Sequence, residues 1–160
     1  MIIVENGTGI EAANSYESVA SFDAFHALRQ NDEAADKTVA EKEAALVRAT
    51  DYIEAHARAQ GAPLSPSQGL QWPVEGSTTV PRQVRSATLI LALYALRGPL
   101  ASPAVRGIKS KSVKAGSIET ETVFDDAAPS DPYPEITAML APVVAQPTSG
   151  ASVSFATVIR

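Results

Sequence analysis

The sequence contains no cysteine, which excludes disulfides, thiolate metal sites and cysteine nucleophiles. Long hydrophobic runs are also missing, because the wholly apolar stretch at residues 89–96 is far shorter than the ~20 residues that a membrane helix needs. Residues 1–5 lack the basic and apolar regions of a signal peptide. We therefore expect a protein that is made in the cytoplasm and has no membrane partner.

Sequence motifs for catalysis are absent as well. There is no Gly-x-Ser-x-Gly elbow and no phosphate-binding loop. His26 and His56 have no second ligand at metal-binding spacing, and Glu54 lies two positions from His56, on a different face of a helix. A metal or catalytic role for either histidine is the alternative to an ordinary surface or partly buried position, which we favour. The sequence thus predicts no enzyme, no catalytic residue, no cofactor and no bound metal.

The charged residues are divided into blocks along the chain. The net charge is −5, but residues 1–60 carry a balance of −6, residues 61–115 a balance of +6 and residues 116–160 a balance of −5. Blocks of opposite sign favour self-complementary assembly if they lie on opposing faces. The alternative is that the blocks mix in space once the chain folds, which would leave no such preference.

The pattern that is present indicates a mainly α fold, a small helical bundle of three main helices and a short C-terminal helix, with a β-hairpin and an extended tail. Ser18 is a suitable N-cap for a helix that ends near residue 29. Thr38 and Glu41 form a capping-box pattern before a helix that ends near residue 59. Pro81 suits the first position of the third helix.

The predicted core combines the apolar stripes of these helices with the single tryptophan. Because residues 89–96 have no polar face, we expect this part of the third helix to be enclosed on all sides, by its own domain or by a neighbouring subunit. The loop after the second helix is expected to fold Trp72 over the helices, and residues 2–4 are expected to form a short strand. The first helix is expected to pack through Val19, Phe22, Phe25 and Leu28, and the core candidates are Phe22, Leu46, Ile53, Trp72, Leu91 and Tyr94.

An alternating pattern predicts a β-hairpin at about residues 108–124. A three-residue loop with Gly116 in the left-handed conformation would pair Lys111 with Glu119 and Lys109 with Glu121, and charge complementarity favours this register. A two-residue turn would instead pair Val113 with Ile118. An isolated hairpin is marginal, so we expect it to pack on the helices or on another chain. The interface candidates are Lys109, Lys111, Lys114, Glu119 and Glu121.

The C-terminal part of the chain changes character after a short helix that Pro134 opens and that carries Ile136, Met139 and Leu140 on one face. We expect a helical domain at residues 1–142, followed by a linker and an extended arm at residues 143–160. The alternating tail either closes the domain's own sheet or adds a strand to a partner. Its docking candidates are Val153, Phe155, Val158 and Ile159.

Direct DNA binding is the less favoured interpretation of the hairpin. Lys109, Lys111 and Lys114 follow Arg106 in a basic run, but the net charge is negative, unlike that of a dedicated nucleic-acid-binding protein. No aromatic residue separates the lysines, as a stacking platform would require. We therefore favour a solvated or subunit-facing hairpin.

Several local patterns, in their order along the chain, resemble those of one protein family. They are Met1-Ile2-Ile3-Val4-Glu5-Asn6-Gly7-Thr8-Gly9, Ala13-Asn14-Ser15-Tyr16, the segment KEAALVRATDYI at residues 42–53, Leu70-Gln71-Trp72-Pro73, Val80-Pro81, the hairpin ending Gly116-Ser117-Ile118-Glu119, and Tyr133-Pro134. Across residues 1–142 the chain resembles the head–tail adaptor (head-completion) proteins of tailed phages, some of which carry the name DnaT-like single-stranded-DNA-binding protein.

This resemblance implies a structural head–tail connector of the phage neck, a mainly helical virion protein that forms a homo-oligomeric ring, commonly dodecameric, beneath the portal. The implied partners are the portal protein, a stopper or tail-completion protein, and genome DNA that passes through the lumen without tight specific binding. The implied location is the head–tail interface of the virion. The alternative, which the shared name suggests, is a single-stranded-DNA-binding accessory protein of DnaT-like type.

Overall fold

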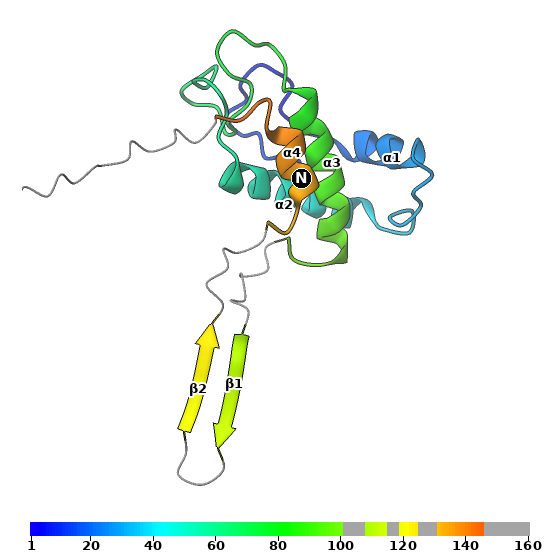
Figure 1. The fold of residues 1–160 in the computed structure, drawn as a ribbon. Helices are drawn as coiled ribbons and strands as arrows, with labels where there is room; N and C mark the ends of the chain where they lie inside the picture. The colour runs from blue at the N-terminus through cyan, green and yellow to red at the C-terminus, as the bar shows by residue number, and fades with distance from the viewer. Residues whose placement is uncertain (101–107, 115–118, 125–130, 146–160) are drawn as a thin grey trace, which may run out of the picture.

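The computed structural model describes residues 1–100, 108–114, 119–124 and 131–145, and it confirms the mainly α fold (Figure 1). Its helices are α1 (Val19–Ala27), α2 (Val39–His56), α3 (Arg82–Arg97) and α4 (Pro134–Leu140). The strands β1 (Ile108–Lys114) and β2 (Glu119–Phe124) form an antiparallel hairpin. Within these described ranges, no helix is long and apolar enough to cross a membrane.

Helix α1 begins at the predicted cap, where the Ser18 hydroxyl accepts a hydrogen bond from the backbone N–H three residues later at 3.1 Å. The helix ends at Ala27, and Leu28 is 85% exposed. The prediction that Leu28 packs inward is wrong, because the chain turns away after the last helical residue. His26 faces the core instead, and its Nε2 lies 3.1 Å from the carbonyl oxygen of Leu89.

Helix α2 begins with the predicted capping box. The Glu41 N–H donates to Thr38 Oγ1 at 3.3 Å, and the Thr38 N–H donates to Glu41 Oε2 at 2.8 Å. The helix ends at His56, three residues earlier than expected, because Ala57 takes an extended conformation with φ −116° and ψ 148°. The following residues therefore leave the helix axis and approach the chain that follows α4.

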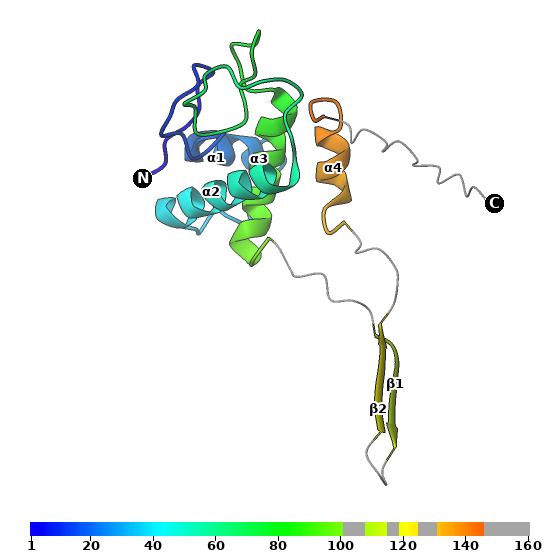
Figure 2. The same ribbon diagram turned by 90° about the vertical axis from the view of Figure 1, so that its left-hand side faces the viewer.

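Helix α3 runs across α2, and the contact between these two helices forms the centre of the body (Figure 2). Pro81 is the N-cap of α3 rather than its first residue, a shift of one position that helix boundaries commonly show. Phe22, Leu46, Ile53 and Leu91 are all at most 1% exposed. Full burial of a side chain of this kind stabilises the fold by about 1.5–3 kcal/mol.

One face of α3 stays partly open to solvent. Ile90 and Tyr94, which are four positions apart and so share this face, are partly buried. The described residues of the chain therefore do not enclose residues 89–96 on all sides by themselves, and enclosure by a neighbouring subunit stays a prediction. Tyr94, one of the core candidates, is partly buried and packs against the core. The physical reason is that α4, which packs on this face, has only 7 residues and covers part of it.

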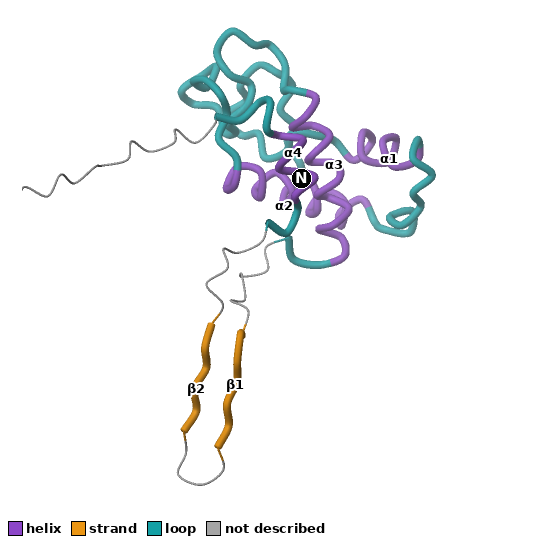
Figure 3. The backbone as a smooth tube through the Cα atoms, in the orientation of Figure 1, coloured by secondary structure: helices purple, strands orange, loops and turns teal. Residues whose placement is uncertain are grey.

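A layer of loops covers one end of the helices (Figure 3). The strand expected at residues 2–4 is absent there, and a single parallel bridge joins Val4 to Ser15. The Glu5 carboxylate, in a residue that is 4% exposed, accepts three backbone N–H groups of residues 7–10 at 2.7–3.0 Å. Charge-assisted bonds of this kind hold a tight turn where a strand would need an extended chain.

Gln71 and Trp72 attach the loop layer to α2. Trp72 is 1% exposed, and its ring meets that of Tyr16 edge to face at a centroid distance of 5.9 Å. The Gln71 amide donates to the carbonyl oxygens of Glu54 and Ala57 at 3.0 and 2.9 Å. Carbonyl groups at a helix C-terminus lack helical partners, so Gln71 satisfies two of them while Trp72 closes one end of the core.

The hairpin has a register that differs from both predictions. Lys114 stands opposite Glu119, Lys111 stands opposite Thr122, and an irregularity lies between Ile108 and Ser110. The predicted pairs Lys111 with Glu119, Lys109 with Glu121, and Val113 with Ile118 are therefore wrong. A cross-strand charge pair contributes only about 0.2–1 kcal/mol, which is too little to fix a register by itself.

The hairpin projects away from the helical body, as both ribbon views show (Figures 1 and 2). In the described part of the chain, β1 and β2 contact each other and no helix. The expected packing of the hairpin on the protein's own helices is therefore absent from these residues. Packing on another chain stays a prediction.

Helix α4 packs its apolar face on α3, with Ile136 and Leu140 only 2% and 6% exposed. Met139 is partly buried beside them. After the helix, Val144 forms an isolated antiparallel bridge with Ala59, and the next residue's N–H donates to a carbonyl oxygen just after α2 at 2.8 Å. The packed body therefore continues to residue 145.

Candidate nucleic-acid interface

Strand β1 carries all three lysines that the sequence singled out. Lys109 lies at the irregularity of the ladder, and Lys111 stands opposite a threonine. Only Lys114 has an acidic residue, Glu119, directly opposite. Glu121, the other acidic candidate, stands opposite Ser112. The backbone register thus leaves two of the three lysines without a directly opposed carboxylate.

The C-terminal docking candidates lie outside the described residues. They are Val153, Phe155, Val158 and Ile159. Arg106, the first residue of the basic run, also lies outside them. These assignments stay predictions.

An aromatic row, consisting of His56, Tyr52, Tyr133 and Tyr94, crosses the helical body from α2 to α3. His56 stacks on Tyr52 with a centroid distance of 4.1 Å and an interplanar angle of 17°. Tyr52 meets Tyr133 edge to face at 5.3 Å, and Tyr133 stacks on Tyr94 at 5.5 Å and 19°. His56 is exposed and the three tyrosines are partly buried. The row therefore presents aromatic edges and faces to solvent across three segments of the chain.

Asp131 holds Tyr133, the third ring of this row, in place. Its carboxylate accepts the Tyr133 N–H at 2.8 Å and the Thr137 hydroxyl at 2.5 Å, and these bonds lower the pKa of Asp131. The Tyr133 hydroxyl donates to the carbonyl oxygen of Leu100 at 2.8 Å. The ring is thus anchored at its backbone and at its phenol, between α3 and α4.

The phenols of Tyr52 and Tyr94 remain protonated near neutral pH. Burial raises the pKa of Tyr52 and that of Tyr94. Tyr94 also donates a hydrogen bond to Glu135 at 3.1 Å, which raises its pKa further. Neither of these two rings therefore carries a phenolate that would repel a phosphate.

Two arginines border the row. The Arg97 guanidinium lies 5.3 Å from the centroid of the Tyr94 ring and forms an ion pair with Glu33, in which the two side chains are 54% and 42% exposed. Arg48 is exposed and precedes Tyr52 by four positions on α2, so the two lie on the same face of the helix. The row thus has a cationic group near each of its two helices.

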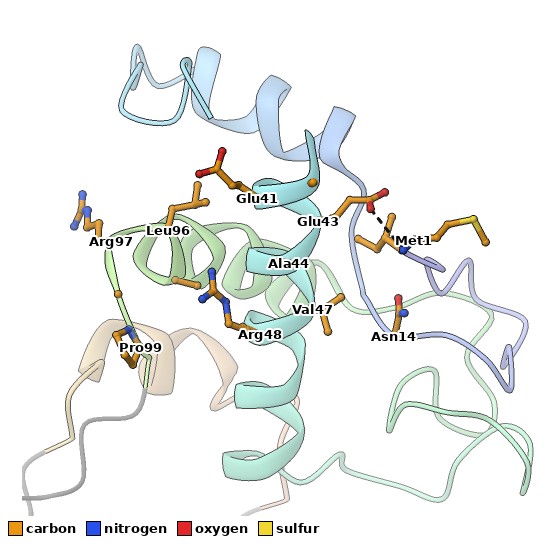
Figure 4. A pocket seen from close by; sticks show the side chains of 14 residues that line it. Met1, Asn14, Glu41, Glu43, Ala44, Val47, Arg48, Leu96, Arg97 and Pro99 are labelled. Carbon is orange, nitrogen blue, oxygen red and sulfur yellow. Dashed lines mark ion pairs between the residues drawn. The ribbon is translucent and has the colours of Figure 1, made fainter. Parts of the chain in front are cut away.

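Two open hollows meet at residues 97–99. One has a volume of about 470 Å³ and lies beside Tyr94 and Tyr133. The other has a volume of about 860 Å³, and Figure 4 shows Arg48 and Arg97 on the same side of it. Its far side holds the N-terminal amine, which pairs with Glu43 at 3.8 Å.

Neither histidine belongs to a metal-binding group. Among the residues that the structure describes, no three His, Cys, Asp or Glu side chains are placed to hold a metal ion. His26 is buried between α1 and α3, whereas His56 is an exposed member of the aromatic row. The five remaining core candidates, Phe22, Leu46, Ile53, Trp72 and Leu91, are buried and contribute packing rather than chemistry.

The aromatic row was not predicted from the sequence. Part of it was visible, because Arg48, Tyr52 and His56 recur at intervals of four on one helical face. The approach of Tyr94 and Tyr133 depends on how α3 and α4 pack, and they are 39 positions apart in the sequence. Local spacing carries no information about such a contact.

Comparison with known proteins decides the family. A family model described as "Putative DnaT-like ssDNA binding protein" matches residues 1–160. The chain belongs to this family. No curated protein and no solved structure matches the chain. The family match agrees with the DnaT-like name in the resemblance and contains nothing about a phage neck, so the connector role stays a prediction.

Proposed function

We propose that this member of the DnaT-like family binds single-stranded DNA. The observation that carries the proposal is the match of the family model to all 160 residues. This function was the alternative in the sequence-based interpretation, and the family match now favours it over the phage connector. Single-stranded DNA is the proposed partner because the description of the family names it.

The lysines of β1 supply the electrostatic part of this proposal. Lys109, Lys111 and Lys114 lie in the only block of the sequence with a positive balance, residues 61–115. The hairpin stands clear of the helical body in the described residues, so a strand of DNA can reach it without displacing a helix. Contacts between lysines and phosphates release counterions, which makes affinity depend strongly on salt.

A salt titration with a labelled oligothymidylate tests the proposal. Each phosphate contact on a single strand contributes about 0.7 to the slope of log K against log salt. Replacing Lys109, Lys111 and Lys114 with alanine should therefore reduce the slope by about 2 and weaken binding most at low salt. Fluorescence anisotropy measured across a series of salt concentrations gives both quantities.

A matched control removes the same charge from the helical body. Arg29→Ala, Lys37→Ala and Arg82→Ala together should leave most of the salt slope in place. Equal losses in the two triple variants would show that only net charge matters. A wild-type protein that gives no anisotropy change at low salt would contradict single-stranded-DNA binding itself.

The ring-forming head–tail connector is the second candidate. The observation that favours it is the hairpin, which in the described part of the chain contacts no helix and so leaves a strand edge for another subunit. Light scattering of the purified protein separates the candidates. A ring of defined mass that lacks affinity for single-stranded DNA supports the connector, and a monomer that binds single strands supports the main proposal.

A further inference from the structure

We infer that the bases of a single strand stack on the aromatic row, while Arg48 and Arg97 contact the adjoining phosphates. This inference rests on the proposed function and names the surface of the helical body that performs it. Proteins that bind single strands commonly combine a basic track with aromatic side chains on which bases stack. The row is a continuous aromatic surface of this type in the described residues, and its members come from α2, α3 and the residue before α4.

The geometry of the row suits flat ligands. Its centroids are separated by 4.1, 5.3 and 5.5 Å in succession, so the four rings contact one another in turn, as two stacked pairs that meet edge to face. The hollow beside Tyr94 and Tyr133 has a volume of about 470 Å³, within the range of about 300–1,000 Å³ that is usual for ligand pockets. A base that enters this hollow meets an aromatic wall on one side. The sequence offers no preference among bases, because every base has a π face.

The charged residues around the aromatic row orient the DNA strand. Glu135 accepts the hydrogen bond of Tyr94, and Asp131 accepts those that hold Tyr133, so both carboxylates lie on the α4 side. Arg48 and Arg97 lie on the opposite side, where α2 meets the end of α3. A phosphate backbone is therefore repelled from α4 and attracted toward Arg48 and Arg97. The second hollow that these arginines line also contains Glu41 and Glu43, and Glu43 pairs with the N-terminal amine.

The ion pair of Arg97 does not prevent this role. Arg97 and Glu33 are both about half exposed, and exposed ion pairs are weak because water screens them. A phosphate can displace the Glu33 carboxylate from the Arg97 guanidinium or bind beside it, because the guanidinium presents five N–H donors in a fixed plane. The ring of Tyr94 beneath it adds a cation–π contact that keeps Arg97 next to the bases.

Two DNA probes of equal length separate base stacking from phosphate attraction. One is an oligothymidylate, and the other is an abasic strand with the same phosphates. Wild-type full-length protein should bind the oligothymidylate at least about 5- to 160-fold more tightly than the abasic strand, the range expected for one stacked base. Tyr94→Leu and His56→Ala should each reduce this preference and leave affinity for the abasic strand almost unchanged.

Phe25→Leu is the matched control. Phe25 is also a partly buried aromatic residue with an arginine over its ring, since the Arg29 guanidinium lies 3.4 Å from its centroid. It lies on α1, which has no contact with α4. The control variant should keep the full preference for the strand that carries bases.

Photocrosslinking of the wild-type protein avoids the risk that a variant fails to fold. Iodouracil-containing single strands should crosslink to Tyr52, Tyr94, Tyr133 or His56. Crosslinks confined to residues 108–124, or equal affinity for the two probes, would overturn the aromatic row and leave single-stranded-DNA binding intact. Failure to bind either probe would instead contradict the proposed function.

Discussion

Replacement of Trp72 by alanine should destabilise the protein by about 4 kcal/mol. The side chain is 1% exposed, so essentially all of its surface leaves water on folding. A buried tryptophan removes about 150–250 Å² from water, which at about 25 cal/mol per Å² corresponds to roughly 4–6 kcal/mol. The edge-to-face contact with Tyr16 adds about 0.5–1.5 kcal/mol, and partial collapse of the cavity returns some of the loss. Measured Trp→Ala losses of about 3–5 kcal/mol agree with this range.

The assay is urea unfolding followed by far-ultraviolet circular dichroism, because the variant lacks the only tryptophan. Leu28→Ala is the control, since Leu28 is 85% exposed and its truncation should change the free energy of unfolding by less than about 0.5 kcal/mol. The free energy of unfolding of an ordinary domain is about 5–15 kcal/mol, so the tryptophan variant should unfold at a much lower urea concentration than the wild type. A loss below about 1 kcal/mol would refute the placement of Trp72 in the core.

Two further predictions concern the loop layer. Burial raises the pKa of Glu54, whose carboxylate accepts bonds from the Tyr16 hydroxyl and the Gln71 N–H, so the folded state holds this proton more tightly than the unfolded chain. The free energy of unfolding should therefore decline as pH rises from the ordinary glutamate pKa through the raised pKa. Urea titrations at several pH values should show a flatter decline for Glu54→Gln than for the wild type. Identical pH profiles for the two proteins would contradict this role of Glu54. Gly7→Ala should cost several kcal/mol in thermal unfolding, because φ is +102° and a Cβ would lie 2.0 Å from the Thr78 carbonyl oxygen; a variant as stable as the wild type would contradict this close approach.

The helices could be predicted because their signals are local. Ser18, Thr38 and Glu41 satisfy backbone groups within one helical turn, so a short stretch of sequence contains both the cap and its partner. The C-terminal ends of the helices were predicted less accurately. Leu28 continues the apolar spacing of α1, but the turn after Ala27 depends on contacts from outside the helix.

Features that depend on distant contacts could not be predicted. The buried Glu5 carboxylate replaces an expected strand, because three backbone N–H groups converge on it only after the turn has formed. The hairpin register was missed because one charge pair is weak compared with a whole ladder. The partial exposure of Tyr94 follows from the length and position of α4. The spacing of apolar residues within α3 carries no information about either.

The same limit applies to the candidate site. The lysines of β1 were visible as a basic run, but no aromatic residue lies between them in the sequence. Tyr52, Tyr94 and Tyr133 come together through the packing of three helices. The absence of aromatic residues between the lysines therefore does not decide whether the protein has an aromatic surface, because the aromatic row and the basic run lie on different elements.

Binding of single-stranded DNA to mapped residues is the measurement that tests the account most directly. An isotopically labelled full-length chain, titrated with oligothymidylate, reports each backbone amide separately by nuclear magnetic resonance. The account predicts progressive shifts at β1 and at Tyr52, His56, Tyr94 and Tyr133, with little change around Glu5. A spectrum that stays unchanged at saturating DNA, or shifts confined to the loop layer, would contradict it.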